Sequence, residues 1–262
     1  MLNKTNNICA FFLLWIIIFI FNSCNSSKLR LPEDIPTIAT ILNTKGYEIN
    51  GYKWKPGEKI EIIAIGKKTQ YSSGDLASIC KVKTINLLIF EKINYLKLTD
   101  EEIDTCSKIQ SLRWDFRGSI LDKDLICKLS EKMNNNRPSF YFSNTNVNDH
   151  MLECISTIPL LNGITFDKKS EIMEAAICNL TSRANGISFF GLSDVSFSRK
   201  ALDCIFSLPN LNRVSLQNWS KVPEEKIWEL VHEYEDRHGR KLDAIIDDPT
   251  SIDSTVWPKN NN

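Results

Sequence analysis

The stretch Cys154-Ile-Ser-Thr-Ile-Pro-Leu-Leu-Asn-Gly-Ile-Thr-Phe166 occurs a second time, as Cys204-Ile-Phe-Ser-Leu-Pro-Asn-Leu-Asn-Arg-Val-Ser-Leu216. Five of the thirteen positions are identical, and five more keep their chemical type. The offset of fifty residues equals two units of about 25 residues, a period typical of stacked structural repeats. A degenerate copy between them, Cys178 to Phe189, keeps the cysteine, an Asn-Gly-Ile sequence and an apolar-x-apolar ending. The sequence therefore predicts a repeat array.

Each unit combines an apolar-x-apolar segment, a polar turn and a stretch with helical spacing. Alternation with period two predicts a short strand with one buried face. The helical stretches are expected at residues 124–129, 151–155, 172–178 and 200–206, and Thr99-Asp-Glu-Glu102 is a capping-box pattern that starts another helix. The predicted strands begin at Leu87, Trp114, Phe140, Ile164, Ile187 and Val214.

The fullest unit is Phe140-Tyr-Phe-Ser-Asn-Thr145-Asn-Val147-Asn-Asp149-His-Met-Leu152. It resembles the leucine-rich repeat family, in the variant where Thr replaces the usual asparagine and a Val-Thr-Asp turn leads into the outer helix. Thr145, Val147 and Asp149 keep that order, whereas Asn148 replaces the second Thr. The resemblance covers residues 76–220 and implies an α/β solenoid, with short parallel strands on the concave side and helices on the outer side.

The segments on either side of the repeats are expected to be atypical terminal caps, because an array must cover its open apolar ends. Residues 34–75 form the predicted amino-terminal cap, with a short helix at 37–42 and β-like runs at 47–54 and 59–65. Residues 221–246 form the predicted carboxyl-terminal cap, a helix that Gly239 ends and a last strand. Residues 247–262 are predicted to be a flexible tail.

The amino terminus predicts export. Residues 8–21 are fourteen nearly unbroken apolar residues, the length of a signal-peptide core and shorter than the roughly 20 needed to span a bilayer. Phe21-Asn-Ser-Cys24 resembles the lipobox of bacterial lipoproteins, although Phe21 and Asn22 depart from it. We therefore expect residues 1–23 to be a signal peptide, Cys24 to be lipidated, and residues 24–33 to be a lipid-anchored tether. The alternative is an uncleaved membrane anchor.

Six of the eight cysteines recur once per unit. Disulfides or a metal site could explain them, but buried Cys also serves as a small apolar residue. Neighbouring helix axes should lie 8–10 Å apart, whereas a disulfide needs Cα atoms within about 7 Å. No C-x-x-C pair occurs, and the three histidines follow no metal-site spacing relative to the cysteines. We therefore expect free, buried thiols and no metal at Cys80, Cys106, Cys127, Cys154, Cys178 and Cys204.

Composition and motifs argue against two classes of function, nucleic-acid binding and catalysis. The 32 basic and 32 acidic residues balance to a net charge of zero, without a basic block, so a nucleic-acid partner is not expected. Phosphate-binding loops, nucleophile elbows and zinc-protease motifs do not occur. We therefore expect neither an enzyme nor a cofactor.

The expected binding surface is the concave side of the sheet, strongest on its first three strands. Tyr and Arg there are residue types that dominate binding energy at interfaces. The predicted contact residues are Leu88, Phe90, Arg113, Asp115, Arg117 and Tyr141.

These features together predict a monomeric, non-catalytic scaffold of the bacterial cell envelope that binds a protein or a glycan. It would be lipid-anchored at the outer membrane or the cell surface. Two alternatives remain open. One is an intracellular adaptor with an uncleaved anchor, since Leu31-Pro-Glu-Asp-Ile35 resembles the start of an F-box. The other is a lipoprotein enzyme whose site lacks a familiar motif.

Overall fold

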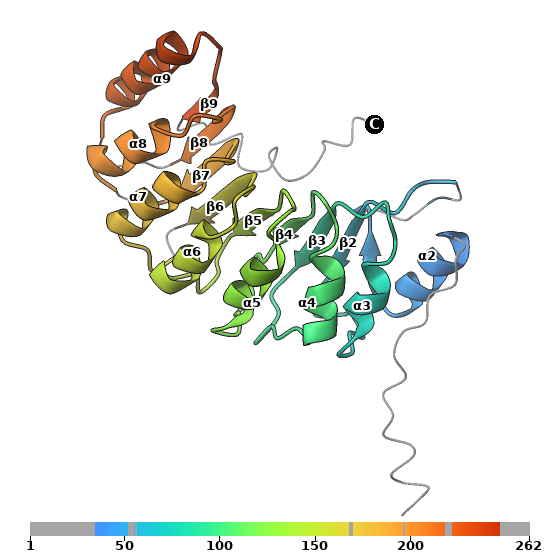
Figure 1. Ribbon diagram of the computed structural model, residues 1–262. Helices are drawn as coiled ribbons and strands as arrows, with labels where there is room; N and C mark the ends of the chain where they lie inside the picture. Colours follow the sequence, from blue (N-terminus) through green and yellow to red (C-terminus); the bar gives the residue numbers. More distant parts are fainter. Residues whose placement is uncertain are drawn as a thin grey trace, which may run out of the picture.

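The structure is a computed structural model, which describes residues 35–51, 55, 57–167, 170–195, 197–217 and 222–246. Nine strands form a single open sheet in sequence order, as Figure 1 shows. The first pair is antiparallel and every later pair is parallel. The strands are β1 (Glu48–Ile49), β2 (Ile62–Ile65), β3 (Leu87–Phe90), β4 (Arg113–Asp115), β5 (Ser139–Phe142), β6 (Gly163–Asp167), β7 (Phe189–Ser193), β8 (Arg213–Gln217) and β9 (Asp243–Ile246).

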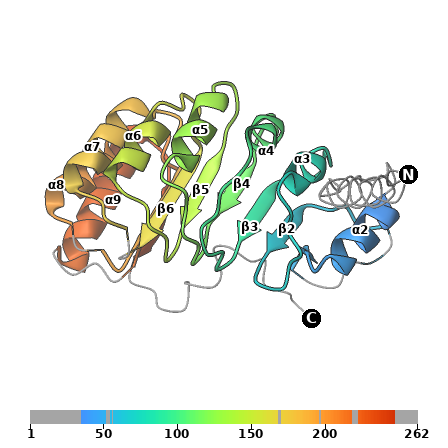
Figure 2. The same cartoon turned by 90° about the horizontal axis from the view of Figure 1, so that it is seen from below.

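One helix follows each parallel strand from β2 to β8, and these helices lie along the outer side of a curved row of strands (Figures 1 and 2). This α/β alternation agrees with the predicted fold class. The helices are α2 (Ile35–Thr44), α3 (Asp75–Ile79), α4 (Asp100–Cys106), α5 (Leu125–Lys132), α6 (Asp149–Ser156), α7 (Glu174–Arg183), α8 (Arg199–Phe206) and α9 (Glu224–His238).

The predicted cap elements are present as secondary structure. Helix α2 and strand β1, which pairs antiparallel with β2, precede the parallel strands, and helix α9 and strand β9 end the described part of the chain. Gly239 follows α9 in a left-handed conformation, with φ of 63°, as expected for a helix C-cap. The capping box at Thr99 and Glu102 is confirmed at the start of α4.

The main core lies between the sheet and the helices, and the strand register decides which residues enter it. Aligned core positions are 24 to 26 residues apart, by subtraction of the paired residue numbers. These aligned, fully buried residues are Leu88, Trp114, Phe140, Ile164, Phe190 and Val214.

In two strands the prediction of which alternate residues point into the core is wrong. In β3, Leu88 and Phe90 enter the main core, whereas Leu87 and Ile89 belong to a second small apolar cluster. In β7 the core pair is Phe190 and Leu192. Ile187 is buried in the main core as predicted but precedes the strand, and the predicted inward position of Phe189 is wrong. Strands β4, β5, β6 and β8 have the predicted alternation.

Contacts that recur from one unit to the next support the stack. The ring of Phe116 stacks between Phe90 and Phe142, with centroid distances of 5.5 and 5.7 Å. Two buried hydroxyls also satisfy strand carbonyls of the preceding unit. Thr145 donates to the carbonyl of Phe116 at 2.7 Å, and Ser119 donates to that of Phe90 at 2.8 Å.

Three disulfides join consecutive helices, and the prediction of free thiols is therefore wrong. The Cα atoms are 5.0, 4.9 and 5.1 Å apart. The prediction failed because it used the distance between helix axes. A helix places its Cα atoms about 2.3 Å from its axis, so facing residues come several ångströms closer than the axes. The pairs are Cys80–Cys106, Cys127–Cys154 and Cys178–Cys204.

Within the described part of the chain, none of the helices is both long and apolar enough to span a membrane. The predicted signal peptide, Cys24, the tether up to residue 33 and the tail from 247 lie outside the described residues.

Candidate binding face of the sheet

The face of the sheet opposite the helices, here called the helix-free face, carries the side chains that alternate with the core residues. Its character changes along the row of strands. On β2 and β3 it is apolar and has little exposed surface. Strand β4 places charged residues there, and β5 to β8 place aromatic, small, polar and charged residues there.

A shallow hollow of about 250 Å³ lies on the helix-free face between β5 and β8. Its lining includes two half-buried aromatic side chains and a group of small or polar residues. Those used in the argument below are Tyr141, Thr165, Phe189, Gly191, Ser215 and Gln217.

Phe189 and Tyr141 make the aromatic part of this hollow. Both rings are half-buried, and their centroids are 6.0 Å apart at an angle of 32°. They belong to β7 and β5, two strands that β6 separates. Phe189 pairs with Gly163 of β6, and a Cβ added at Gly163 would lie 3.4 Å from the Phe189 side chain. The strand between the two aromatic residues therefore places no side chain against Phe189 at this position.

Gly191 forms the floor of the hollow, because it too has no side chain on this face. A Cβ there would lie 2.5 Å from Cγ2 of Thr165 and 3.4 Å from the ring of Phe189. Gly191 thus keeps the surface low at the floor of the hollow, where a side chain would otherwise fill the depression.

Two arginines lie at the ends of the aromatic pair. The guanidinium carbon of Arg213 is 5.8 Å from the centroid of Phe189, within cation–π range. Arg213 also forms an ion pair with Asp243 at 3.3 Å. On the other side, Arg113 donates to the side-chain oxygen of Asn86 at 3.4 Å.

Burial raises the pKa of Tyr141 above its usual value; nearby Asp115 also raises it, while Arg113 and Arg213 act in the opposite direction. The phenol therefore stays neutral at physiological pH and can donate a hydrogen bond. A face with rigid rings, hydroxyls and an amide suits the stacking and hydrogen bonding of a ligand.

Two acidic residues line the hollow, Asp167 and Asp194, and Asp167 has structural partners. It accepts a hydrogen bond from the backbone N–H of Asn144 at 2.6 Å and one from the hydroxyl of Ser143 at 3.3 Å. These bonds hold the turn after β5.

The predicted site residues separate into three groups. Leu88 and Phe90 are fully buried in the main core, so their predicted place on an exposed face is wrong. Asp115 and Arg117 form an ion pair with each other, in which Asp115 is almost completely buried. Arg113 is half-buried on β4, and Tyr141 alone among the six lines the hollow.

Sequence reasoning missed Phe189, the second aromatic residue of the hollow. The match of residues 185–187 to the Asn-Gly-Ile of 162–164 aligned this unit three residues too early, since Gly163 pairs with Phe189 in the sheet. The run Phe189-Phe190-Gly191-Leu192 could have indicated this residue. Successive residues of a strand point to opposite faces, and this run has apolar residues at positions of both faces.

Comparison of the sequence with protein-family models and with curated proteins found no match.

Proposed function

We propose that this protein is a leucine-rich repeat scaffold of the cell envelope, without catalytic activity, that binds a protein or glycan in the hollow of its helix-free face. The observation that carries this proposal is the half-buried pair of Tyr141 and Phe189 beside Gly191, all three of which line the hollow. Aromatic rings of this kind supply most of the binding energy at many interfaces.

Recurrence of the structure at 24 to 26 residues supports the repeat assignment. The buried hydroxyls of Ser119 and Thr145 play one role in successive units, since each bonds the preceding strand. This arrangement fits the resemblance of residues 140–152 to the variant repeat with Thr at the usual asparagine position.

The disulfides support export. Disulfides form and persist in oxidising compartments and are rare where thiols are kept reduced. Three such bonds therefore favour the lipid-anchored envelope protein over the intracellular adaptor. Lipidation of Cys24 remains a prediction from the sequence.

The test compares the hollow with an aromatic residue elsewhere. Full-length protein carrying Phe189→Ala or Tyr141→Ala is assayed on a glycan array and by proximity labelling in the native cell. Each change should weaken binding about 30-fold, which corresponds to about 2 kcal/mol. Far-UV circular dichroism checks that the variants fold.

Tyr95→Ala is the matched control, because Tyr95 is 60% exposed and does not line the hollow. It should leave the bound glycans and the labelled proteins unchanged. Unaltered binding in both hollow variants, together with loss of binding after substitutions on the outer helices, would contradict the proposal.

A further inference from the structure

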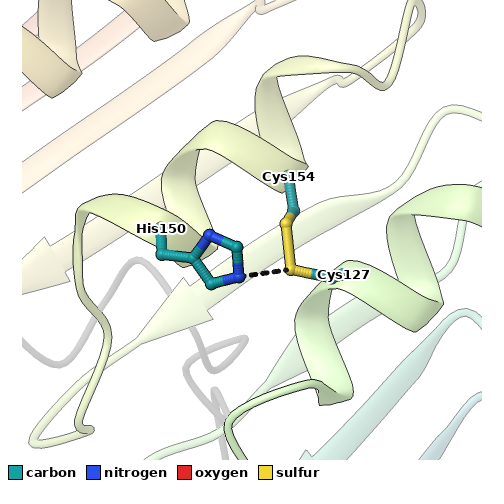
Figure 3. Close-up of side chains that lie close together, drawn as sticks. All are labelled: Cys127, His150 and Cys154. Atoms are coloured by element: carbon teal, nitrogen blue, oxygen red, sulfur yellow. Dashed lines mark hydrogen bonds between the residues drawn. A yellow bond between two sulfur atoms is a disulfide. The ribbon is translucent and has the colours of Figure 1, made fainter.

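The Cys127–Cys154 pair differs from the other disulfides because a histidine lies beside it. Nε2 of His150 is 3.6 Å from Sγ of Cys127, as the dashed line in Figure 3 marks. His150 precedes Cys154 by four residues on α6, so both side chains lie on one side of that helix. Cys127 comes from the neighbouring helix α5. The potential ligand atoms of the three residues all lie within 4.8 Å of one another.

These distances are close to those of a tetrahedral zinc site. With Zn–S near 2.3 Å and Zn–N near 2.0–2.1 Å, a sulfur and a nitrogen on one zinc ion are about 3.6 Å apart. His150 and Cys127 already have that separation. Two zinc-bound sulfurs are about 3.8 Å apart, and side-chain rotation can separate the sulfurs once their bond is broken. The site is also accessible, since His150 is exposed and both cysteines are half-buried.

We propose that reduction of Cys127–Cys154 opens a zinc-binding site formed by Cys127, Cys154 and His150. A dithiol reductant supplies two electrons and two protons, which break the S–S bond and give two thiols, and the reductant leaves as its own disulfide. Zn²⁺ then displaces the two thiol protons into solvent and forms two Zn–S bonds. His150 contributes the lone pair of Nε2, and water takes the fourth position, as in three-ligand zinc sites.

Zinc and disulfide are thus alternative links between α5 and α6. Two thiolates neutralise the charge of the ion, and the neutral imidazole adds none. The other pairs lack a histidine at the corresponding position, four residues before the second cysteine. Lys200 stands there for Cys178–Cys204. For Cys80–Cys106 the residue is Glu102, whose buried carboxylate already accepts hydrogen bonds from Tyr71 and from three backbone N–H groups. The site therefore belongs to the middle pair.

The experiment uses the full-length protein, reduced with a phosphine and freed of metal, and adds Zn²⁺ before alkylation. Peptide mass spectrometry then reports each cysteine separately. Zinc should protect Cys127 and Cys154 from alkylation. Cys178 and Cys204, which are half-buried like them, are the internal control and should stay unprotected. A competing chelator measures the affinity, and Co²⁺ in place of Zn²⁺ should give a thiolate charge-transfer band.

His150→Ala should weaken the zinc affinity by at least about 100-fold, because loss of a direct ligand should exceed the 10–100-fold cost of losing an outer-shell partner. His150 is exposed, so this variant should fold, and circular dichroism checks that it does. The proposal is overturned if Zn²⁺ protects both pairs alike, protects neither, or binds His150→Ala as tightly as the original protein.

Discussion

At the scale of single residues, two buried carboxylates organise the junction between the amino-terminal segment and the first helices. Asp75 and Glu102 have no exposed surface. Asp75 accepts hydrogen bonds from Lys45 at 2.7 Å and from Tyr47 at 2.9 Å. Glu102 accepts one from Tyr71 at 2.7 Å. Burial, with the neighbouring carboxylates, raises the pKa of both tyrosines, so they remain neutral donors.

Glu102→Ala should therefore be strongly destabilising. Its carboxylate accepts from the backbone N–H of Gly74, Leu76 and Thr99 at 2.8 to 3.2 Å, besides the hydroxyl of Tyr71. Removing it leaves these buried donors without an acceptor, at an expected cost of about 3 kcal/mol or more in the free energy of unfolding. Urea denaturation measures this cost.

Asp100→Ala serves as the control on the same helix. Asp100 is 90% exposed and forms a surface ion pair with Lys128 at 3.3 Å. Its loss should change the free energy of unfolding by less than about 1 kcal/mol. Equal effects of the two substitutions would mean that Glu102 is not a structural acceptor.

At the scale of elements, the spacing between successive units was predictable from sequence. Which residues of each strand point into the core was harder to predict. Trp114-Asp115-Phe116 alternates apolar and polar residues, and Trp114 and Phe116 lie in the core as predicted. Leu87-Leu88-Ile89-Phe90 is apolar throughout, so alternation could not choose between its two faces. Leu88 pairs with Trp114 in the neighbouring strand, and this pairing places Leu88 on the core side.

The contact between β6 and β7 should depend on Gly191. In Gly191→Ala the new Cβ would lie 2.5 Å from Cγ2 of Thr165, closer than atoms can pack. The expected loss is about 1–3 kcal/mol of unfolding free energy. Gly66→Ala is the matched control, because nothing lies within 4 Å of an added Cβ there, and it should be nearly neutral.

A second substitution tests the cause of that loss. Thr165→Ser removes the clashing methyl group, so it should recover much of the stability lost in Gly191→Ala. The double-mutant cycle should give a coupling energy of about 1 kcal/mol or more. Additive effects would show that the strain at Gly191 has another source.

At the scale of the whole molecule, the disulfides divide the array into pairs of units. They join α3 to α4, α5 to α6 and α7 to α8, and leave the helix contacts between these pairs without a covalent link. The sequence indicated one cysteine per unit but not this pairing. The pairing depends on how closely facing residues approach, and a repeat period carries no information on that distance.

The last prediction concerns how the whole molecule is held at a membrane. If Cys24 carries the lipid, Cys24→Ala should either leave the precursor uncleaved or release soluble protein, because stable anchoring needs two or more acyl chains. Mass spectrometry of the original protein should find an amino terminus at Cys24 with added acyl mass. Cys9→Ala is the matched control, since Cys9 lies within the apolar run, and it should leave processing unchanged.

An intact amino terminus in the original protein, with membrane retention equal to that of Cys24→Ala, would favour the uncleaved anchor. That outcome would reopen the intracellular adaptor, and the oxidised state of the six repeat cysteines in the cell would then decide between the compartments, because the cytosol would keep them reduced.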